Sequence, residues 1–321
     1  MVFFAGSPAF SQNTPATNSL DGIQAGIAGF TNAMAESLPL NSTLGLNWSD
    51  AYIGKLMGVP PHFGVGLSAG FTTIKTEAFH ELLDRFGVSV PAGMDAFVPI
   101  PAYTGELRLG GFGIPFDLGF KAGYLPPVDL GKGTEFSYFL IGGDFRFAIL
   151  EDKAIIPGIS VGLGAYHLSG GISAPLPGQT FGFLKDGDDY QIKSPNSRGD
   201  FTWETTTLEL KAQISKRIFI ITPYLGAGLN YAWVKGGAAV KGDLEYNTVK
   251  YDDINQALSN AGISGFDFEE DGFSSVMETS GIGFRAFGGF AFNILAVKID
   301  LTGMVDSHGN FGTSLGVRFQ L

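Results

Sequence analysis

The chain has 321 residues, of which 47 are glycine, 29 are phenylalanine and none is cysteine, so disulfide bonds and thiolate metal sites are excluded. Its 31 acidic and 20 basic residues give a net charge of −11, which argues against nucleic acid as a partner. Because the sequence has no run of 18 apolar residues, it predicts no transmembrane helix.

The N-terminal region is predicted to hold an export remnant followed by a helix. Residues 1–12 combine a short apolar run with small residues, which is typical of the end of a signal peptide. Residues 13–60 are predicted to form a helical plug or a segment on the periplasmic side of the next domain. Pro39 lies just past the expected end of the helix. Its apolar residues recur at spacings of three and four and form one stripe: Leu20, Ile23, Ile27, Phe30 and Met34.

The stretch from 40 to 60 is ambiguous. Leu44, Leu46 and Trp48 alternate with polar or small residues, as they would in a strand, and Pro60-Pro61 ends the segment. If residues 43–52 are a strand, the total in the chain rises toward twelve. Otherwise the residues after 60 account for ten.

Residues 61–321 are predicted to be one all-β domain. In each segment apolar residues alternate with small or polar ones; Leu208 and Leu210, for example, alternate with Glu209 and Lys211. One such segment also fits a soluble sandwich, but several of about ten residues each favour a membrane barrel. The predicted strands fall near 62–75, 101–110, 114–124, 135–149, 155–168, 201–215, 219–235, 279–293, 295–305 and 311–321.

The connections between these segments alternate in length. Those at 111–113, 150–154, 216–218 and around 294 are short, whereas 76–100, 125–134, 169–200 and 236–278 are longer. Short periplasmic turns and longer outer loops are the pattern of a bacterial outer-membrane barrel. The fold prediction is therefore a transmembrane antiparallel β-barrel of about ten strands, with twelve as the alternative.

The alternate residues that form the polar side of each predicted strand are predicted to line the barrel lumen. On this polar side there are five acids and seven bases. A narrow, partly dehydrated interior requires such a near balance, because unpaired charge there is costly. The predicted lining residues are Glu106, Arg108, Asp117, Lys121, Asp144, Arg146, Glu209, Lys211, Arg285, Lys298, Asp300 and Arg318.

Aromatic residues near the segment ends are predicted to form girdles at the two membrane interfaces. They are Trp48, Trp203, Trp233, Tyr103, Tyr124, Tyr138 and Tyr231.

The sequence predicts no catalytic residue, metal site or cofactor. The four histidines are far apart in the chain and have no metal-binding spacing, and His167 near Ser169 is not marked as part of an activated pair. The acidic stretch around Asp188 lacks the glutamate that ends a calcium loop. We expect a protein that is not an enzyme.

The C-terminal residues 316–321, G-V-R-F-Q-L, resemble the last strand of bacterial outer-membrane proteins, although that family usually ends in Phe and this chain ends in Leu321. The resemblance implies an outer-membrane location, contact with outer-membrane lipid and recognition by the barrel assembly machinery. The wider pattern resembles uncharacterised barrels of spirochaetes and Bacteroidetes and, more remotely, transporters of the long-chain fatty-acid type. It transfers no functional residue.

The predicted function is a channel or transporter for small solutes, hydrophobic ones among them, whose lumen the N-terminal segment partly occludes. The alternative is a structural or adhesive outer-membrane protein that acts through its acidic outer loops.

Overall fold

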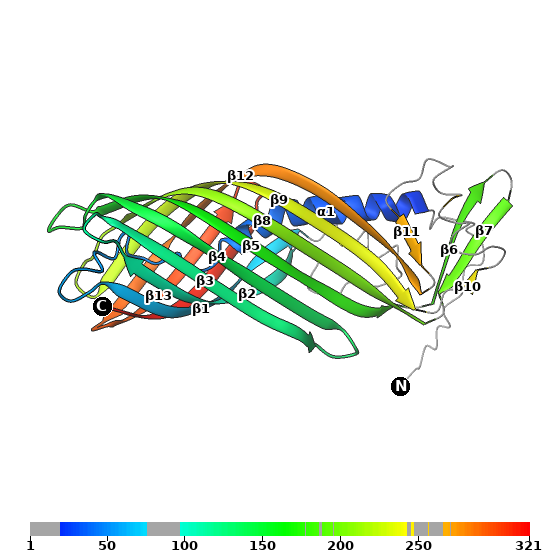
Figure 1. Cartoon of the computed structure of the whole chain (residues 1–321), viewed down its shortest axis with the longest axis horizontal. Helices are drawn as coiled ribbons and strands as arrows, with labels where there is room; N and C mark the ends of the chain where they lie inside the picture. Colours follow the sequence, from blue (N-terminus) through cyan, green and yellow to red (C-terminus); the bar gives the residue numbers. More distant parts are fainter. Residues whose placement is uncertain are drawn as a thin grey trace, which may run out of the picture.

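The protein is described by a computed structural model, which covers residues 20–75, 97–176, 178–185, 188–194, 196–242, 245–246, 256, 266–269 and 271–321. Ten antiparallel strands form a closed barrel, in the order β12-β13-β14-β1-β2-β3-β4-β5-β8-β9, and β9 pairs with β12 to close it. Figure 1 shows the barrel from the side. The prediction of an all-β barrel of ten strands is confirmed.

The barrel strands have the following bounds: β1 Phe63–Lys75, β2 Phe97–Gly110, β3 Phe116–Asp129, β4 Glu135–Leu150, β5 Gly158–Leu176, β8 Ser197–Ser215, β9 Ile221–Gly242, β12 Gly272–Ile294, β13 Val297–Asp306 and β14 Phe311–Gln320. The first and last strands pair along their length, from Gly64 opposite Gln320 to Thr72 opposite Gly312. The apolar terminal strand therefore has neighbours on both sides, which removes the hazard of an open edge.

Four short strands lie outside the barrel circuit. β11 (Phe266–Glu269) pairs with the beginning of β12. β6 (Gln179–Lys185), β7 (Asp188–Ser194) and β10 (Glu245–Tyr246) form a separate three-stranded sheet beyond one end of the barrel, on the right in Figure 1. We refer to that end as the long-loop end and to the opposite end, where the C-terminus lies, as the short-turn end.

The strands on one side of the barrel are much longer than predicted. β5, β8, β9 and β12 have 19, 19, 22 and 23 residues, whereas β13 and β14 have 10 each. The stretches 169–200 and 236–278, expected as loops, thus begin and end as strand. The alternation was missed because its sign reverses there.

That reversal is plain on β8. Toward the short-turn end Leu208 and Leu210 face outward and are exposed, while Glu209 is buried inside. Toward the long-loop end Trp203 is buried inside and Glu204 faces outward. The outer surface therefore changes from apolar to polar along the strand, as it must where a strand leaves the hydrocarbon layer for water.

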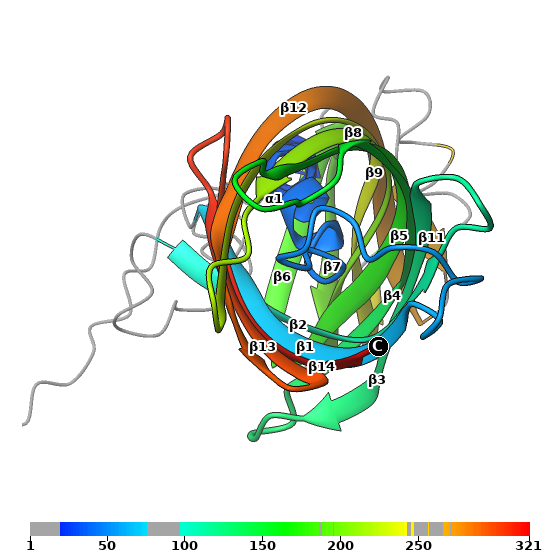
Figure 2. The same cartoon turned by 90° about the vertical axis from the view of Figure 1, so that its left-hand side faces the viewer.

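A single helix among the described residues, α1 (Leu20–Ser42), lies inside the barrel, where Figure 2 shows it within the ring of strands. Pro39 lies within the helix and not beyond it, which corrects the prediction. In the last turn two hydroxyl groups bond back to helix carbonyls: Ser42 Oγ donates to the Pro39 carbonyl and Thr43 Oγ1 to that of Leu40. In the part of the chain that the structure describes, no helix is long and apolar enough to cross a membrane.

Residues 43–62 contain no strand that joins the barrel, so the twelve-strand alternative is wrong. Their alternating Leu44, Leu46 and Trp48 are all buried inside the barrel, where apolar side chains can alternate without any sheet. The only strand-like contact in this stretch is an isolated bridge between Lys55 and Gly111.

The aromatic girdle is only partly as predicted. Tyr103, Tyr124, Tyr231 and Trp233 are exposed on the outer wall. The other three predicted members, Trp48, Trp203 and Tyr138, are buried inside the barrel. Trp203 and Tyr138 lie on the projecting parts of the strands, where the aromatic side faces inward.

Candidate functional site

The interior of the barrel toward the short-turn end is built from charged side chains. All twelve predicted lining residues point inward and none is more than 6% exposed. They come from nearly every strand of the circuit: β2 (Glu106, Arg108), β3 (Asp117, Lys121), β4 (Asp144, Arg146), β8 (Glu209, Lys211), β12 (Arg285), β13 (Lys298, Asp300) and β14 (Arg318). We call this set the charged wall.

Many of these side chains pair with each other. Arg108 Nη1 donates to Asp117 Oδ1 at 2.6 Å, and Arg146 Nη2 donates to Asp117 Oδ2 at 2.8 Å. Lys211 Nζ lies 2.5 Å from Asp144 Oδ2, and Arg285 pairs with Glu209. Such pairs compensate the loss of hydration that burial imposes on each charge.

Three side chains of the charged wall also bind the main chain of the plug segment, residues 41–55. Lys121 Nζ donates to the carbonyl oxygens of Ser42 and Leu44, both at 2.6 Å. Arg108 Nη2 donates to Leu46 O at 3.2 Å, and Arg146 Nη1 to Asp50 O at 2.7 Å. The carbonyl groups of a segment without regular structure are thereby satisfied inside the barrel.

Amide groups of the plug segment donate in the other direction. Ser49 N donates to Asp300 Oδ1 at 3.1 Å, Ala51 N to Ser215 Oγ at 2.9 Å, and Ile53 N to Asp117 Oδ2 at 3.1 Å. The segment is therefore held by its backbone against β3, β8 and β13 at once. The plug segment therefore lies inside the barrel and is held there by polar contacts.

Asp50 supplies negative charge that the wall lacks. Its carboxylate accepts from Lys298 Nζ at 2.6 Å and from Arg318 Nη2 at 2.8 Å. Asp50 lies in the connection to β1, and although burial raises the pKa of its carboxyl, Lys298 and Arg318 lower that pKa below its ordinary value. With seven bases against five acids on the wall, the plug brings the interior closer to neutrality.

Trp48 anchors the middle of the plug segment. Its ring lies under two guanidinium groups, those of Arg318 at 4.6 Å and Arg108 at 5.4 Å. Its Nε1 donates to Glu106 Oε2. Cation–π contacts and a charge-assisted hydrogen bond are strong where water is excluded, so this side chain fixes the plug in one position.

Gly45 allows the plug to approach the wall closely. Its φ is +82°, and a Cβ there would lie 2.5 Å from Thr104 Oγ1 and 2.9 Å from Glu106 Oε1. Only glycine fits both the backbone conformation and the space.

Helix α1 fills the other half of the lumen with apolar contacts. Ile27, Phe30 and Met34 of the predicted stripe are fully buried, while the side chains of Leu20 and Ile23 lie outside the described part of the chain. Phe30 packs on Phe201, with ring centroids 6.0 Å apart. The wall around the helix is apolar here as well, and includes Ile74, Ile100, Leu140, Leu168, Trp203, Val234 and Val240.

Hydrogen bonds of Asn310 and Asn41 position the helix in this apolar region. Asn310, in the turn between β13 and β14, donates from Nδ2 to the Glu36 carbonyl at 3.0 Å and accepts from Ser37 Oγ at 3.3 Å. Asn41 Nδ2 donates to Thr72 Oγ1 at 2.8 Å. These bonds are few compared with those of the plug segment.

A side pocket of about 290 Å³ lies between α1 and β12. Beyond Arg285, which is opposite Asp306, β12 extends past β13, and between Val276 and Phe284 it has no strand on that side within the described residues. The pocket lies at this gap in the wall. Its lining includes Asn32, Ala35 and Glu36 of the helix, Gly281 and Ile282 of β12, and His308 of the turn.

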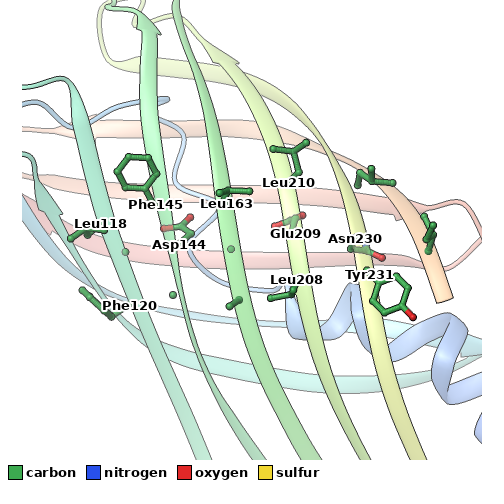
Figure 3. A pocket seen from close by; sticks show the side chains of 16 residues that line it. Leu118, Phe120, Asp144, Phe145, Leu163, Leu208, Glu209, Leu210, Asn230 and Tyr231 are labelled. Carbon is green, nitrogen blue, oxygen red and sulfur yellow. The ribbon is translucent and has the colours of Figure 1, made fainter. Parts of the chain in front are cut away.

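A second hollow lies on the outer wall. It is lined mainly by exposed apolar side chains of β3, β4, β5, β8 and β9, among them Phe120, Phe145, Leu163 and Leu208 (Figure 3). The labelled Asp144 and Glu209 belong to the inner side of the same strands. An open apolar depression in this position is where lipid chains would pack, so it is not part of the lumen.

The histidines are not gathered in the described structure. His167 Nδ1 lies 3.1 Å from Thr206 Oγ1 on the outer wall, His308 is in the β13–β14 turn and His80 lies outside the described residues. Among the residues that the structure describes, no three His, Asp or Glu side chains are grouped to hold a metal ion. In the acidic stretch around Asp188, residues 186–187 lie outside the described residues and Asp188 begins β7.

The sequence analysis identified the charged side chains of the wall but not their partners. Asp50, Trp48, Asn41 and Asn310 carry much of the contact between plug and wall, and none was predicted to do so. A signal was present: seven bases against five acids on the predicted wall require an acid from elsewhere, and Asp50 is the acidic residue within the plug segment.

The family model DUF6588, a family of unknown function, matches residues 25–321. Comparison with curated proteins gives no match. Among solved structures, the chain is similar to the outer membrane protease OmpT from Escherichia coli, with 10% identity, 82% of this chain and 97% of that chain covered, and a TM-score of 0.43. It is also similar to the toluene transporter TbuX of Ralstonia pickettii (10% identity, 81% and 89% covered, TM-score 0.27) and to the toluene transporter TodX of Pseudomonas putida (8%, 81% and 88%, 0.28). At these TM-scores the similarities assign no function.

Proposed function

The chain belongs to the DUF6588 family, and we propose that it is a gated bacterial outer-membrane transporter for small apolar solutes, with α1 and the plug segment as its gate. The short-turn end would face the periplasm and the long-loop end the outside. We further propose that outer-membrane lipid surrounds the barrel, that the barrel assembly machinery inserts it, and that the protein has no enzymatic activity. The resemblance to uncharacterised barrels of spirochaetes and Bacteroidetes stays a prediction.

One observation carries the proposal: α1 occupies an apolar half-lumen and borders a side pocket. An element that only reinforced the barrel would not need a gap beside it, whereas a movable one needs space. The helix packs through Ile27, Phe30 and Met34 and has few hydrogen bonds to the wall, so its displacement would expose an apolar path. An apolar path favours apolar solutes over ions or sugars.

The test is to lock the helix to the wall. Ser42 and Thr207 are in direct contact, since their hydroxyl oxygens lie 3.0 Å apart. The variant Ser42→Cys/Thr207→Cys would form a disulfide in a chain that has no other cysteine. The rate of uptake of the apolar fluorescent probe N-phenyl-1-naphthylamine would be measured in intact cells that express the variant.

We expect slow uptake from the oxidised variant and recovery after a reductant is added, because only the disulfide prevents movement of the helix. The two single-cysteine variants are the matched controls and should not respond to the reductant. Equal uptake in oxidised, reduced and vector-only cells, with the barrel folded, would contradict a transport function.

A structural or adhesive role is the second candidate, and the filled lumen favours it. The strands that project beyond the apolar band carry exposed charges, including Glu204, Lys235 and Glu278. A partner would bind this polar surface while the barrel serves as an anchor. Loss of partner binding on exchange of these residues, without any change of probe uptake, would support this role.

A further inference from the structure

The direction in which α1 runs through the barrel can be followed from its contacts. Thr31, at the middle of the helix, contacts Gly236 in the long-loop part of β9. Ser42, its last residue, donates to Thr207 in the middle of β8 at 3.0 Å. The chain then reaches Ser215, the final residue of β8, through the amide of Ala51. The contacts thus descend steadily from the long-loop end to the short-turn end.

The barrel strands form a closed hydrogen-bonded circuit, although β12 has no strand on one side between Val276 and Phe284 among the described residues. Each of the ten strands is hydrogen-bonded to two neighbours, including β1 to β14 and β9 to β12. Between Thr31 and Ala51 the chain therefore traverses the lumen lengthwise and then enters β1 at the short-turn end. Figure 1 shows the N-terminal end of α1 on the side of β6 and β11, opposite the C-terminus.

We propose that α1 is threaded through the barrel with its N-terminal end at the cell surface. The assignment of sides follows from the connections, because short turns face the periplasm and long loops face outward in outer-membrane barrels. The element that closes the lumen can then be reached from outside the cell, so a surface partner could act on the gate without entering the barrel. This topology goes beyond the proposed transport function and holds whether or not the lumen conducts.

The absence of native cysteine allows a direct test on living cells. Three single variants would be labelled with a membrane-impermeant maleimide before and after permeabilisation of the outer membrane. Ala25→Cys marks the exposed end of α1, Thr134→Cys, at a half-buried position, marks the β3–β4 turn at the long-loop end, and Ile155→Cys marks the exposed β4–β5 turn at the short-turn end. Each protein is first shown to be folded by its resistance to unfolding in cold detergent.

The proposal predicts labelling of Ala25→Cys and Thr134→Cys on intact cells and of Ile155→Cys only after permeabilisation. Protection of Ala25→Cys on intact cells, whatever permeabilisation then does, overturns the threading. Labelling of Ile155→Cys but not Thr134→Cys on intact cells overturns the assignment of sides. If the helix instead enters the barrel from the periplasm, Ala25→Cys is protected on intact cells while Thr134→Cys is still labelled.

Discussion

Replacement of Asp50 by asparagine should release the plug. The substitution keeps the size of the side chain and removes its charge. Lys298 then loses its carboxylate, and it has no other acceptor among the described residues. Arg318 keeps Asp300, which its Nη1 contacts at 2.5 Å, so the main cost falls on Lys298.

The size of the effect follows from the burial of the ion pair. The side chain of Lys298 is 3% exposed and that of Asp50 is 15% exposed. Removal of one partner of a buried ion pair costs about 3–5 kcal/mol, because the other charge stays desolvated. The cost applies to the closed state alone, since water would hydrate Lys298 once the plug leaves. With the lower value, the ratio of closed to open barrels should fall about 100-fold.

The assay is the open probability of single molecules in a planar lipid bilayer in potassium chloride. The control is Glu278→Gln, which removes the same charge from an exposed pair with Lys235, where water screens the interaction. The double variant Asp50→Asn/Lys298→Gln should return toward the closed state, because no unpaired ammonium group remains in the lumen.

An unchanged open probability in Asp50→Asn, with the barrel folded, would refute this reasoning. So would an equal increase in Glu278→Gln, because then the charge itself and not its buried position would matter. Failure of the double variant to recover would mean that Asp50 holds the plug through contacts other than Lys298.

Three further results are expected. Gly45→Val should lower the free energy of unfolding by about 1–3 kcal/mol in urea titrations, whereas Gly131→Ala, at a similar positive φ but with nothing within 4 Å, should cost less because it meets no clash. Leu163→Lys, on the outer wall, should destabilise the barrel in vesicles by about 2–4 kcal/mol if it lies near the bilayer midplane, and Thr206→Lys, in the polar row, by less. A chain that lacks residues 20–55 should form a pore that prefers anions, because seven bases then face five acids; its reversal potential in a salt gradient would show a cation preference if this is wrong.

The architecture could be predicted because a membrane barrel imposes a strict pattern on its strands. Within the apolar band each outward residue must be apolar and each inward one small or polar, so segments such as 205–215 are recognisable on their own. Ten strands and the alternation of short and long connections follow from that pattern. The lengths of the strands did not follow, because the pattern applies only inside the hydrocarbon layer.

The contacts of the plug could not be predicted because they depend on a segment without periodicity. Most bonds between residues 41–55 and the wall use main-chain atoms, which any sequence would offer. Leu44, Leu46 and Trp48 alternate with Gly45 and Asn47 as they would in a strand, but all five residues are buried, so the pattern does not separate two faces here. Three residues at positive φ, Gly45, Leu46 and Gly54, distinguish the segment from a strand, and a single sequence does not show φ.

The barrel interior has two different kinds of contact with one continuous chain, and this division bears on how a gate could work. Toward the short-turn end the plug segment is bound by directional hydrogen bonds and ion pairs, which hold one geometry and fail together when one charge is lost. Toward the long-loop end α1 is held by apolar packing, which tolerates sliding and rotation at lower cost. A force on the outer end of the helix would therefore move the helix first and reach Asp50 last. If the proposed transport function holds, the charged contacts would set the threshold for opening, and the apolar half would provide the path of the solute once the helix has moved.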